Sequence, residues 1–148
     1  MGLASAPGPV LLAVANRALD RLATDFVNSH PGASSYFCAQ ADAVDFVCGR
    51  AVDLILLDVD VSLMAGFVLA AYIRAADRGR DDCGSVAIVA ATSSECKFQD
   101  CLVGGSAIDG ALKMPCDSRV FGDCVDRWCL ADDLQSRRIA GVDRAPAG

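Results

Sequence analysis

Residues 52–60 read VDLILLDVD, and their apolar run ends on an aspartate, Asp58. An apolar run of this length without polar alternation is typical of a strand buried on both faces of a sheet. Its last residue then lies at the carboxyl edge of the sheet, where ligands bind in open parallel α/β folds. The run therefore predicts a central strand that presents the Asp58 carboxylate at a position suited to binding or chemistry.

On either side of this strand, apolar runs alternate with segments of helical periodicity. Strands are expected at residues 9–15, 34–39, 52–58, 85–91 and within 107–113, and helices from 16 to the turn at 30–32, at 41–47, at 64–74, after 92–95 and at 120–129. The third helix has Phe67, Ala70, Ala71 and Ile73 available for the core side. A polar loop is expected at 77–84, and the glycines at 104–105 are expected to break the fourth helix. Five strand–helix units predict an α/β fold, a flavodoxin-like, doubly wound parallel sheet, (βα)5, with strand order 2-1-3-4-5.

The chain has 148 residues, 53% hydrophobic and 22% charged, which suits one domain with a sizeable core. We assign residues 1–8 to a flexible lead-in, 9–132 to the domain and 133–148 to a polar tail. The net charge of −6 argues against direct binding to nucleic acid or to an anionic membrane, because both need clustered cations. No apolar run approaches the roughly 18 residues of a membrane-spanning helix, and the first residues lack the basic segment of a secretory signal. We expect a cytoplasmic protein.

The eight cysteines and the single histidine do not form a metal-binding pattern. Structural zinc sites usually contain close cysteine pairs, and no Cys-x-x-Cys is present. A chain of this size does not need disulfides, so the cysteines are expected to be buried or half-buried free thiols. His30 precedes Pro-Gly in a turn and is expected to be exposed and non-catalytic. Trp128 is expected to anchor the last helix in the core or in an interface.

Over roughly residues 9–130, the chain resembles the receiver (response regulatory) domain of two-component phosphorelay proteins. The strongest match is DLILLDV at 53–59 continued by MAGF at 64–67, where the family has L-L-D-V-x-M-P-x-M-D-G-F. A threonine after the fourth strand and a proline after the fifth agree with it. The proline and the second aspartate of the pattern are replaced by Ser62 and Ala65.

The resemblance implies that Asp58 is the phosphoacceptor and that the backbone carbonyl of Asp60 occupies a metal-ligand position. It implies that Thr92, with Ser93 beside it, binds phosphoryl oxygens, although Thr92 serves equally well as a helix cap. Phosphorylation of a carboxylate brings anions together, so a divalent ion and cations must neutralise them. Asp58 and Asp60 are weak candidates for binding a metal by their side chains, because no third ligand is evident.

Two departures from the family pattern concern those neutralising groups. The acidic pair that holds Mg²⁺ in the family corresponds to Val14 and Ala15, and the phosphate-binding lysine corresponds to Met114. Lys113 is one residue earlier and should point away from Asp58, because neighbouring strand residues face opposite sides. Metal stabilisation is worth several kcal/mol, so its loss predicts phosphorylation slowed on the order of hundreds to thousands of times. The hypothesis is a degenerate, pseudo-receiver-like domain without a cofactor, and no bound Mg²⁺ is expected.

Two functions follow from the resemblance. The first is a non-enzymatic interaction module that uses the face of the fourth helix, fifth strand and fifth helix; the candidate contact residues are Phe98, Leu102, Ala111 and Val120. Its partners would be a histidine kinase, a phosphotransfer domain or the neighbouring domains of a hybrid histidine kinase. The alternative is a working receiver phosphorylated on Asp58 by a kinase or phosphotransfer domain. An enzyme acting on a small substrate has little support, because the first strand is not followed by a glycine-rich phosphate loop.

Overall fold

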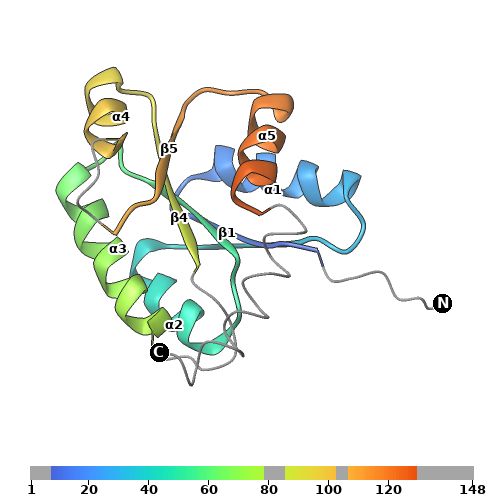
Figure 1. Cartoon of the computed structure of the whole chain (residues 1–148), viewed down its shortest axis with the longest axis horizontal. Helices are drawn as coiled ribbons and strands as arrows, with labels where there is room; N and C mark the ends of the chain where they lie inside the picture. The colour runs from blue at the N-terminus through green and yellow to red at the C-terminus, as the bar shows by residue number, and fades with distance from the viewer. Residues whose placement is uncertain (1–7, 79–85, 103–106, 130–148) are drawn as a thin grey trace, which may run out of the picture.

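The computed structural model describes residues 8–78, 86–102 and 107–129. These residues form a sheet with helices on both faces (Figure 1). The strands are β1 (Val10–Val14), β2 (Ser34–Cys38), β3 (Leu54–Asp58), β4 (Ala87–Thr92) and β5 (Gly110–Lys113). The helices are α1 (Arg17–Ser29), α2 (Ala43–Gly49), α3 (Leu63–Arg78), α4 (Glu95–Leu102) and α5 (Ser118–Trp128), with a 3-10 turn, η1 (Gln40–Asp42), before α2.

The five strands are parallel and follow the order β2-β1-β3-β4-β5, which confirms the predicted topology. β3 lies in the middle of the sheet, where Leu57 aligns with Val14 of β1 and Asp58 aligns with Ala91 of β4. All four apolar residues of β3 are fully buried. The central apolar run therefore carries Asp58 to the carboxyl edge of the sheet.

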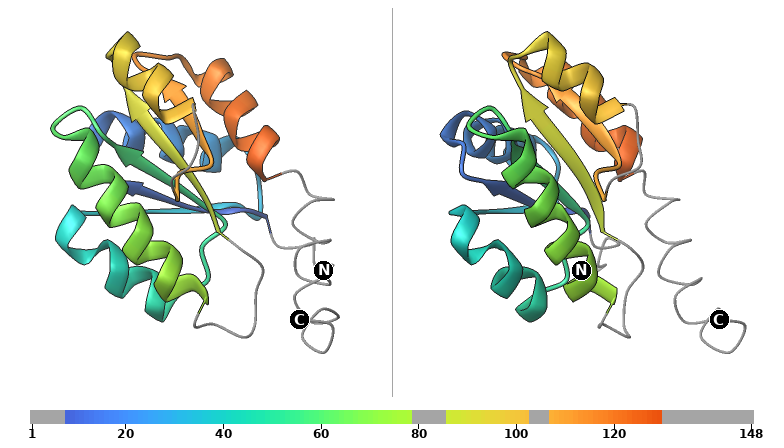
Figure 2. Two further views of the ribbon diagram at one scale, coloured as in Figure 1. Left: turned by 60° about the vertical axis from the view of Figure 1, so that its left-hand side comes forward. Right: turned by 90° about the vertical axis from the view of Figure 1, so that its left-hand side faces the viewer.

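Two hydrophobic cores lie on opposite faces of the sheet, because alternate strand residues point to opposite sides. Leu12 and Ile55 belong to the core under α2, α3 and α4. Leu11 and Leu56 belong to the core under α1 and α5. Figure 2 shows α1 and α5 together on one side of the sheet and α2 and α3 together on the other. Packing of these two helix layers against the sheet holds the strands in place, including the end of β3 at Asp58.

Side-chain caps fix where α1 and α5 begin. The Asn16 side-chain oxygen accepts hydrogen bonds from the amides of Ala18 at 2.8 Å and Leu19 at 3.2 Å. Asp117 accepts from the amide of Val120 at 2.9 Å. Such caps satisfy amides that the first turn of a helix leaves unpaired. The loop after β1 is thereby held close to the carboxyl edge of the sheet.

The predicted polar loop at 77–84 is wrong at its start, because α3 continues to Arg78. Asp77 is buried, and its carboxylate accepts a hydrogen bond from the Val86 amide at 3.0 Å. Arg74 forms an ion pair with Asp109 at 2.7 Å. These charged side chains tie α3 to the segments that lead into β4 and β5, although the sequence places Asp77 in a loop.

Three further expectations need correction. Ala71 was assigned to the core side of α3 but is exposed, because the buried face passes through Ala70 and Ile73. The described cysteines are free, as expected, but Cys48 and Cys96 are exposed, on helix positions turned away from the sheet. Ala15 does not extend β1, which ends at Val14. The glycines at 104–105, the tail at 133–148 and all of the lead-in except residue 8 lie outside the described residues.

Within the part of the chain that the structure describes, no helix combines the length and the apolar character needed to cross a bilayer.

Candidate functional site

Asp58 is half-buried at the last residue of β3, and both of its carboxylate oxygens accept hydrogen bonds. The side-chain amide of Asn16 donates to Oδ2 at 3.2 Å. The backbone amide of Asp60 donates to Oδ1 at 2.8 Å. Asp58 is therefore bound from two sides, by the loop after β1 and by the loop after β3. Sequence reasoning had used Asn16 only to mark the start of a helix.

The residues at the positions of the acidic pair have no ligand oxygen in their side chains. Val14 is fully buried in the core under α2 and α3. Ala15 is exposed and has a backbone φ of 67°, in the left-handed region. A non-glycine residue there costs about 1 kcal/mol, and asparagine or aspartate tolerates that conformation better than alanine does. The backbone at Ala15 thus suits an acidic residue better than the residue present.

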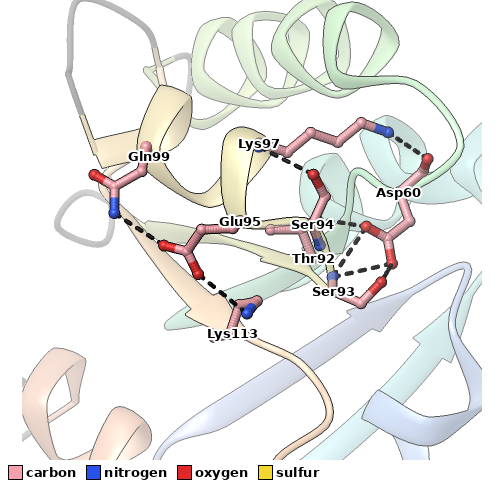
Figure 3. Close-up of polar contacts among 8 residues, drawn as sticks. All are labelled: Asp60, Thr92, Ser93, Ser94, Glu95, Lys97, Gln99 and Lys113. Carbon is pink, nitrogen blue, oxygen red and sulfur yellow. Dashed lines mark hydrogen bonds and ion pairs between the residues drawn. The ribbon is translucent and has the colours of Figure 1, made fainter.

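The Asp60 carboxylate is bound at the start of α4 by three donors (Figure 3). The Thr92 hydroxyl donates to Oδ1 at 2.5 Å, and the Ser93 hydroxyl donates to Oδ2 at 2.9 Å. The Ser93 amide lies 3.1 Å from both oxygens. Thr92 is fully buried, and its hydroxyl oxygen also accepts a hydrogen bond from the Ser94 amide at 3.0 Å. Both residues expected to bind phosphoryl oxygens therefore bind a carboxylate of the same chain.

The pKa of Asp60 lies below its ordinary value. Partial desolvation raises this pKa, but the hydrogen bonds from Thr92 and Ser93, together with the positive charge of Lys97, lower it further than desolvation raises it. Hydrogen bonds to the charged form of a carboxyl group favour ionisation. At neutral pH the group held against Thr92 and Ser93 is therefore an anion.

Lys97, in the first turn of α4, reaches back to the loop after β3. Its Nζ donates to the backbone carbonyl of Asp60 at 2.5 Å (Figure 3). It also donates to the backbone carbonyl of Val59 at 3.3 Å. The Asp60 carbonyl is the one that the resemblance assigns to a metal, so an ammonium group contacts that oxygen here. The sequence offers one signal for this residue: a lysine in the first turn of a helix, where acidic residues are more favourable.

Lys113 is exposed and pairs with Glu95 of α4, with Nζ 3.2 Å from Oε1. Figure 3 shows this pair and the Asp60 cluster as separate groups of contacts. Met114, at the position of the phosphate-binding lysine, is half-buried and packs against the core under α1 and α5. The Lys113 contact with Glu95 is consistent with the predicted orientation away from Asp58.

Few of the described residues at the carboxyl edge carry the side-chain oxygens that a divalent ion needs as ligands. Within residues 8–78, 86–102 and 107–129, no three His, Cys, Asp or Glu side chains come together around a common point. Asp58 is the one carboxylate among the described residues at the expected metal position, and each of its oxygens accepts one hydrogen bond. Mg²⁺ prefers octahedral coordination by oxygen at about 2.0–2.1 Å. The contacts of Asp58, Asp60 and Lys97 supply hydrogen-bond partners in place of such a set.

The predicted interaction face lies along α4, β5 and α5. Leu102 and Val120 are exposed, and they line a groove of about 290 Å³ together with Ala111 and Trp128. Phe98 is half-buried on α4 and is not part of that groove. Leu102, Ala111 and Val120 are thus brought together on one concave surface.

Comparison with solved structures identifies the fold, whereas no family model and no curated protein sequence matches the chain. A chain from the co-crystal of the histidine phosphotransfer signalling protein Ypd1 of Saccharomyces cerevisiae with the receiver domain of its downstream response regulator Ssk1 aligns with a TM-score of 0.69 and 21% identity, over 86% of this chain and 93% of that one. The receiver domain of a Pseudomonas aeruginosa sensor histidine kinase, crystallised with magnesium in its active-site cleft, aligns with a TM-score of 0.61 and 24% identity, over 83% and 98%. Chemotaxis protein CheY4 of Vibrio cholerae aligns at 0.62 and 18%, over 83% and 99%. The chain therefore has the fold of response-regulator receiver domains.

Proposed function

We propose that this chain is an atypical receiver domain of two-component signalling that acts through protein contacts rather than through phosphorylation of Asp58. The observation that carries the proposal is the occupancy of the carboxyl edge by the chain's own groups. Thr92 and Ser93 bind the Asp60 carboxylate, and Lys97 contacts the Asp60 carbonyl. Val14 and Ala15 contribute no metal ligand. An incoming phosphoryl group would meet negative charge without a metal ion to neutralise it.

The interaction face supports the second half of the proposal. Leu102 and Val120 are 51% and 46% exposed, and Asp58 is not among the residues that line the groove between them. Exposed apolar groups around a concave surface are typical of sites that bind a partner. One structural neighbour was crystallised with a histidine phosphotransfer protein. We therefore propose a phosphotransfer domain, a histidine kinase or a neighbouring domain of a hybrid kinase as the partner class, and a cytoplasmic location.

A working phosphoacceptor is the second candidate, and one observation favours it. Asp58 is half-buried rather than enclosed, at the sheet edge where the fold places reactive groups. Phosphorylation would form a bond between an Asp58 oxygen and phosphorus while the bond to the leaving group of the donor breaks. The two candidates differ in whether this reaction proceeds at a useful rate.

The test is incubation of the protein with acetyl phosphate and Mg²⁺, followed by intact mass spectrometry. We expect labelling of the wild type at the level of an Asp58→Asn variant, because Val14 and Ala15 supply no side-chain metal ligand and Lys97 already contacts the Asp60 carbonyl. A typical magnesium-binding receiver domain, treated in parallel, controls for the donor. Rapid stoichiometric addition of one phosphoryl group, abolished by Asp58→Asn, would establish the working phosphoacceptor instead.

A further inference from the structure

The loop after β3 and the start of α4 hold each other through contacts that run in both directions. We propose that Asp60 and Lys97 form a latch that keeps α4 in one position relative to the sheet without an added phosphoryl group. We call this set of contacts, made by Asp60, Thr92, Ser93 and Lys97, the α4 latch. The inference rests on the proposed function, because it concerns the regulation of the same site.

The first half of the latch runs from the loop to the helix. The Asp60 carboxylate accepts from the Thr92 hydroxyl and from both the hydroxyl and the amide of Ser93. Hydrogen bonds to a charged acceptor are about twice as strong as those between neutral groups. Ser93 is the second residue before α4 begins at Glu95, so this carboxylate restrains the segment that leads into the helix.

The second half runs from the helix back to the loop. The Lys97 side chain crosses to the backbone carbonyls of Asp60 and Val59. The Ser94 hydroxyl caps the same turn of α4 by accepting from the Lys97 amide at 3.3 Å. The first turn of α4 is therefore joined to the loop after β3 by the Asp60 carboxylate and by the Lys97 ammonium group. Displacement of either side chain weakens the contacts that the other one makes.

The latch also determines what Asp58 can do. The Thr92 hydroxyl has one proton, which is donated to Asp60, so a group attached to Asp58 must displace that carboxylate to receive the same hydrogen bond. The Asp60 amide meanwhile donates to Asp58. Thr92 and Ser93 can therefore donate their hydrogen bonds either to Asp60 or to an added phosphoryl group, but not to both at once. With the latch closed, α4 presents Leu102 in a constant position.

Hydrogen exchange of the Ser93 amide, followed by NMR in the free protein, tests the latch. We expect Asp60→Ala to accelerate this exchange at least about tenfold, because loss of a hydrogen bond to a charged group removes roughly 1.5–3 kcal/mol. Lys97→Met should also accelerate it. The matched controls are Asp25→Ala and Arg21→Met, at an exposed carboxylate and an exposed arginine on α1, far from the latch in the sequence. Both controls should leave the exchange rate within about twofold of the wild type.

A double-mutant cycle gives an independent reading. If the latch is one unit, the fall in melting temperature of the Asp60→Ala, Lys97→Met double variant is smaller than the sum of the two single falls. Unchanged Ser93 exchange in Asp60→Ala, or strictly additive melting temperatures, would overturn the inference. Both readouts use the free protein without a phosphodonor, so their failure is distinguishable from failure of the proposed function, which the acetyl phosphate assay measures.

Discussion

Replacing Val14 with aspartate is expected to lower the free energy of unfolding by about 3–5 kcal/mol, the effect of leaving a charge buried and unpaired. Val14 is the last residue of β1 and is fully buried between Cys38 of β2 and Leu57 of β3. Because its neighbours in that core are apolar, a carboxylate there has no hydrogen-bond partner among them. Urea unfolding measures the change as a lower midpoint at an unchanged slope.

The neighbouring substitution Ala15→Asp is the matched control, since it adds the same group one residue later. Ala15 is exposed, and its left-handed backbone suits aspartate, so we expect a change within about 1 kcal/mol. Urea unfolding repeated with Mg²⁺ should show no recovery of stability in the Val14→Asp, Ala15→Asp double variant, because Lys97 still contacts the Asp60 carbonyl. Wild-type stability of Val14→Asp would show that a carboxylate is accommodated at this position, and full recovery of the double variant with Mg²⁺ would show that this edge can bind a metal ion.

Truncating Phe121 to alanine is expected to cost about 3–5 kcal/mol, the usual range for a fully buried phenylalanine. Phe121 of α5 has no exposed surface, and its ring lies edge-on to Phe26 of α1, with centroids 6.4 Å apart. This pair joins the two helices on their face of the sheet. Domains are typically stable by only 5–15 kcal/mol, so the loss should appear as a large fall in melting temperature.

Val120→Ala separates the stability of α5 from the interaction face that the helix presents. Val120 precedes Phe121 but is 46% exposed, so its truncation should change stability by less than about 0.5 kcal/mol. We expect circular dichroism melts to show a large loss for Phe121→Ala and almost none for Val120→Ala. Equal losses would mean that α5 is held by its outer face rather than by the contact with Phe26.

The fold was predictable because its signals are local and strong. The apolar run that ends at Asp58 is typical of a strand buried on both faces, and alternation of such runs with amphipathic segments leaves few topologies. Local signals failed where charged residues take long-range partners. Asp77 resembles a loop residue, yet its carboxylate binds an amide at the start of the next strand, which spacing alone does not indicate.

The candidate site was predictable in its backbone positions and not in its side-chain contacts. Asp58 and Thr92 end neighbouring strands, so the pairing of the strands brings them to one edge of the sheet independently of the path of the loops. The direction of the Asp60 side chain depends on the path of the loop after β3, and the reach of Lys97 depends on where α4 begins. Both residues therefore become informative only in three dimensions.

We propose that the chain's own groups occupy the carboxyl edge of the sheet and leave no place for a metal-assisted phosphoryl group. A crystal structure obtained after soaking with Mg²⁺ and beryllium fluoride, a mimic of the phosphoryl group, tests it most directly. We expect the Asp60 carboxylate to remain bound to Thr92 and Ser93, with no added ion on Asp58. The proposal would be wrong if an octahedral ion bound Asp58 and the Asp60 carbonyl while a fluoride accepted a hydrogen bond from the Thr92 hydroxyl.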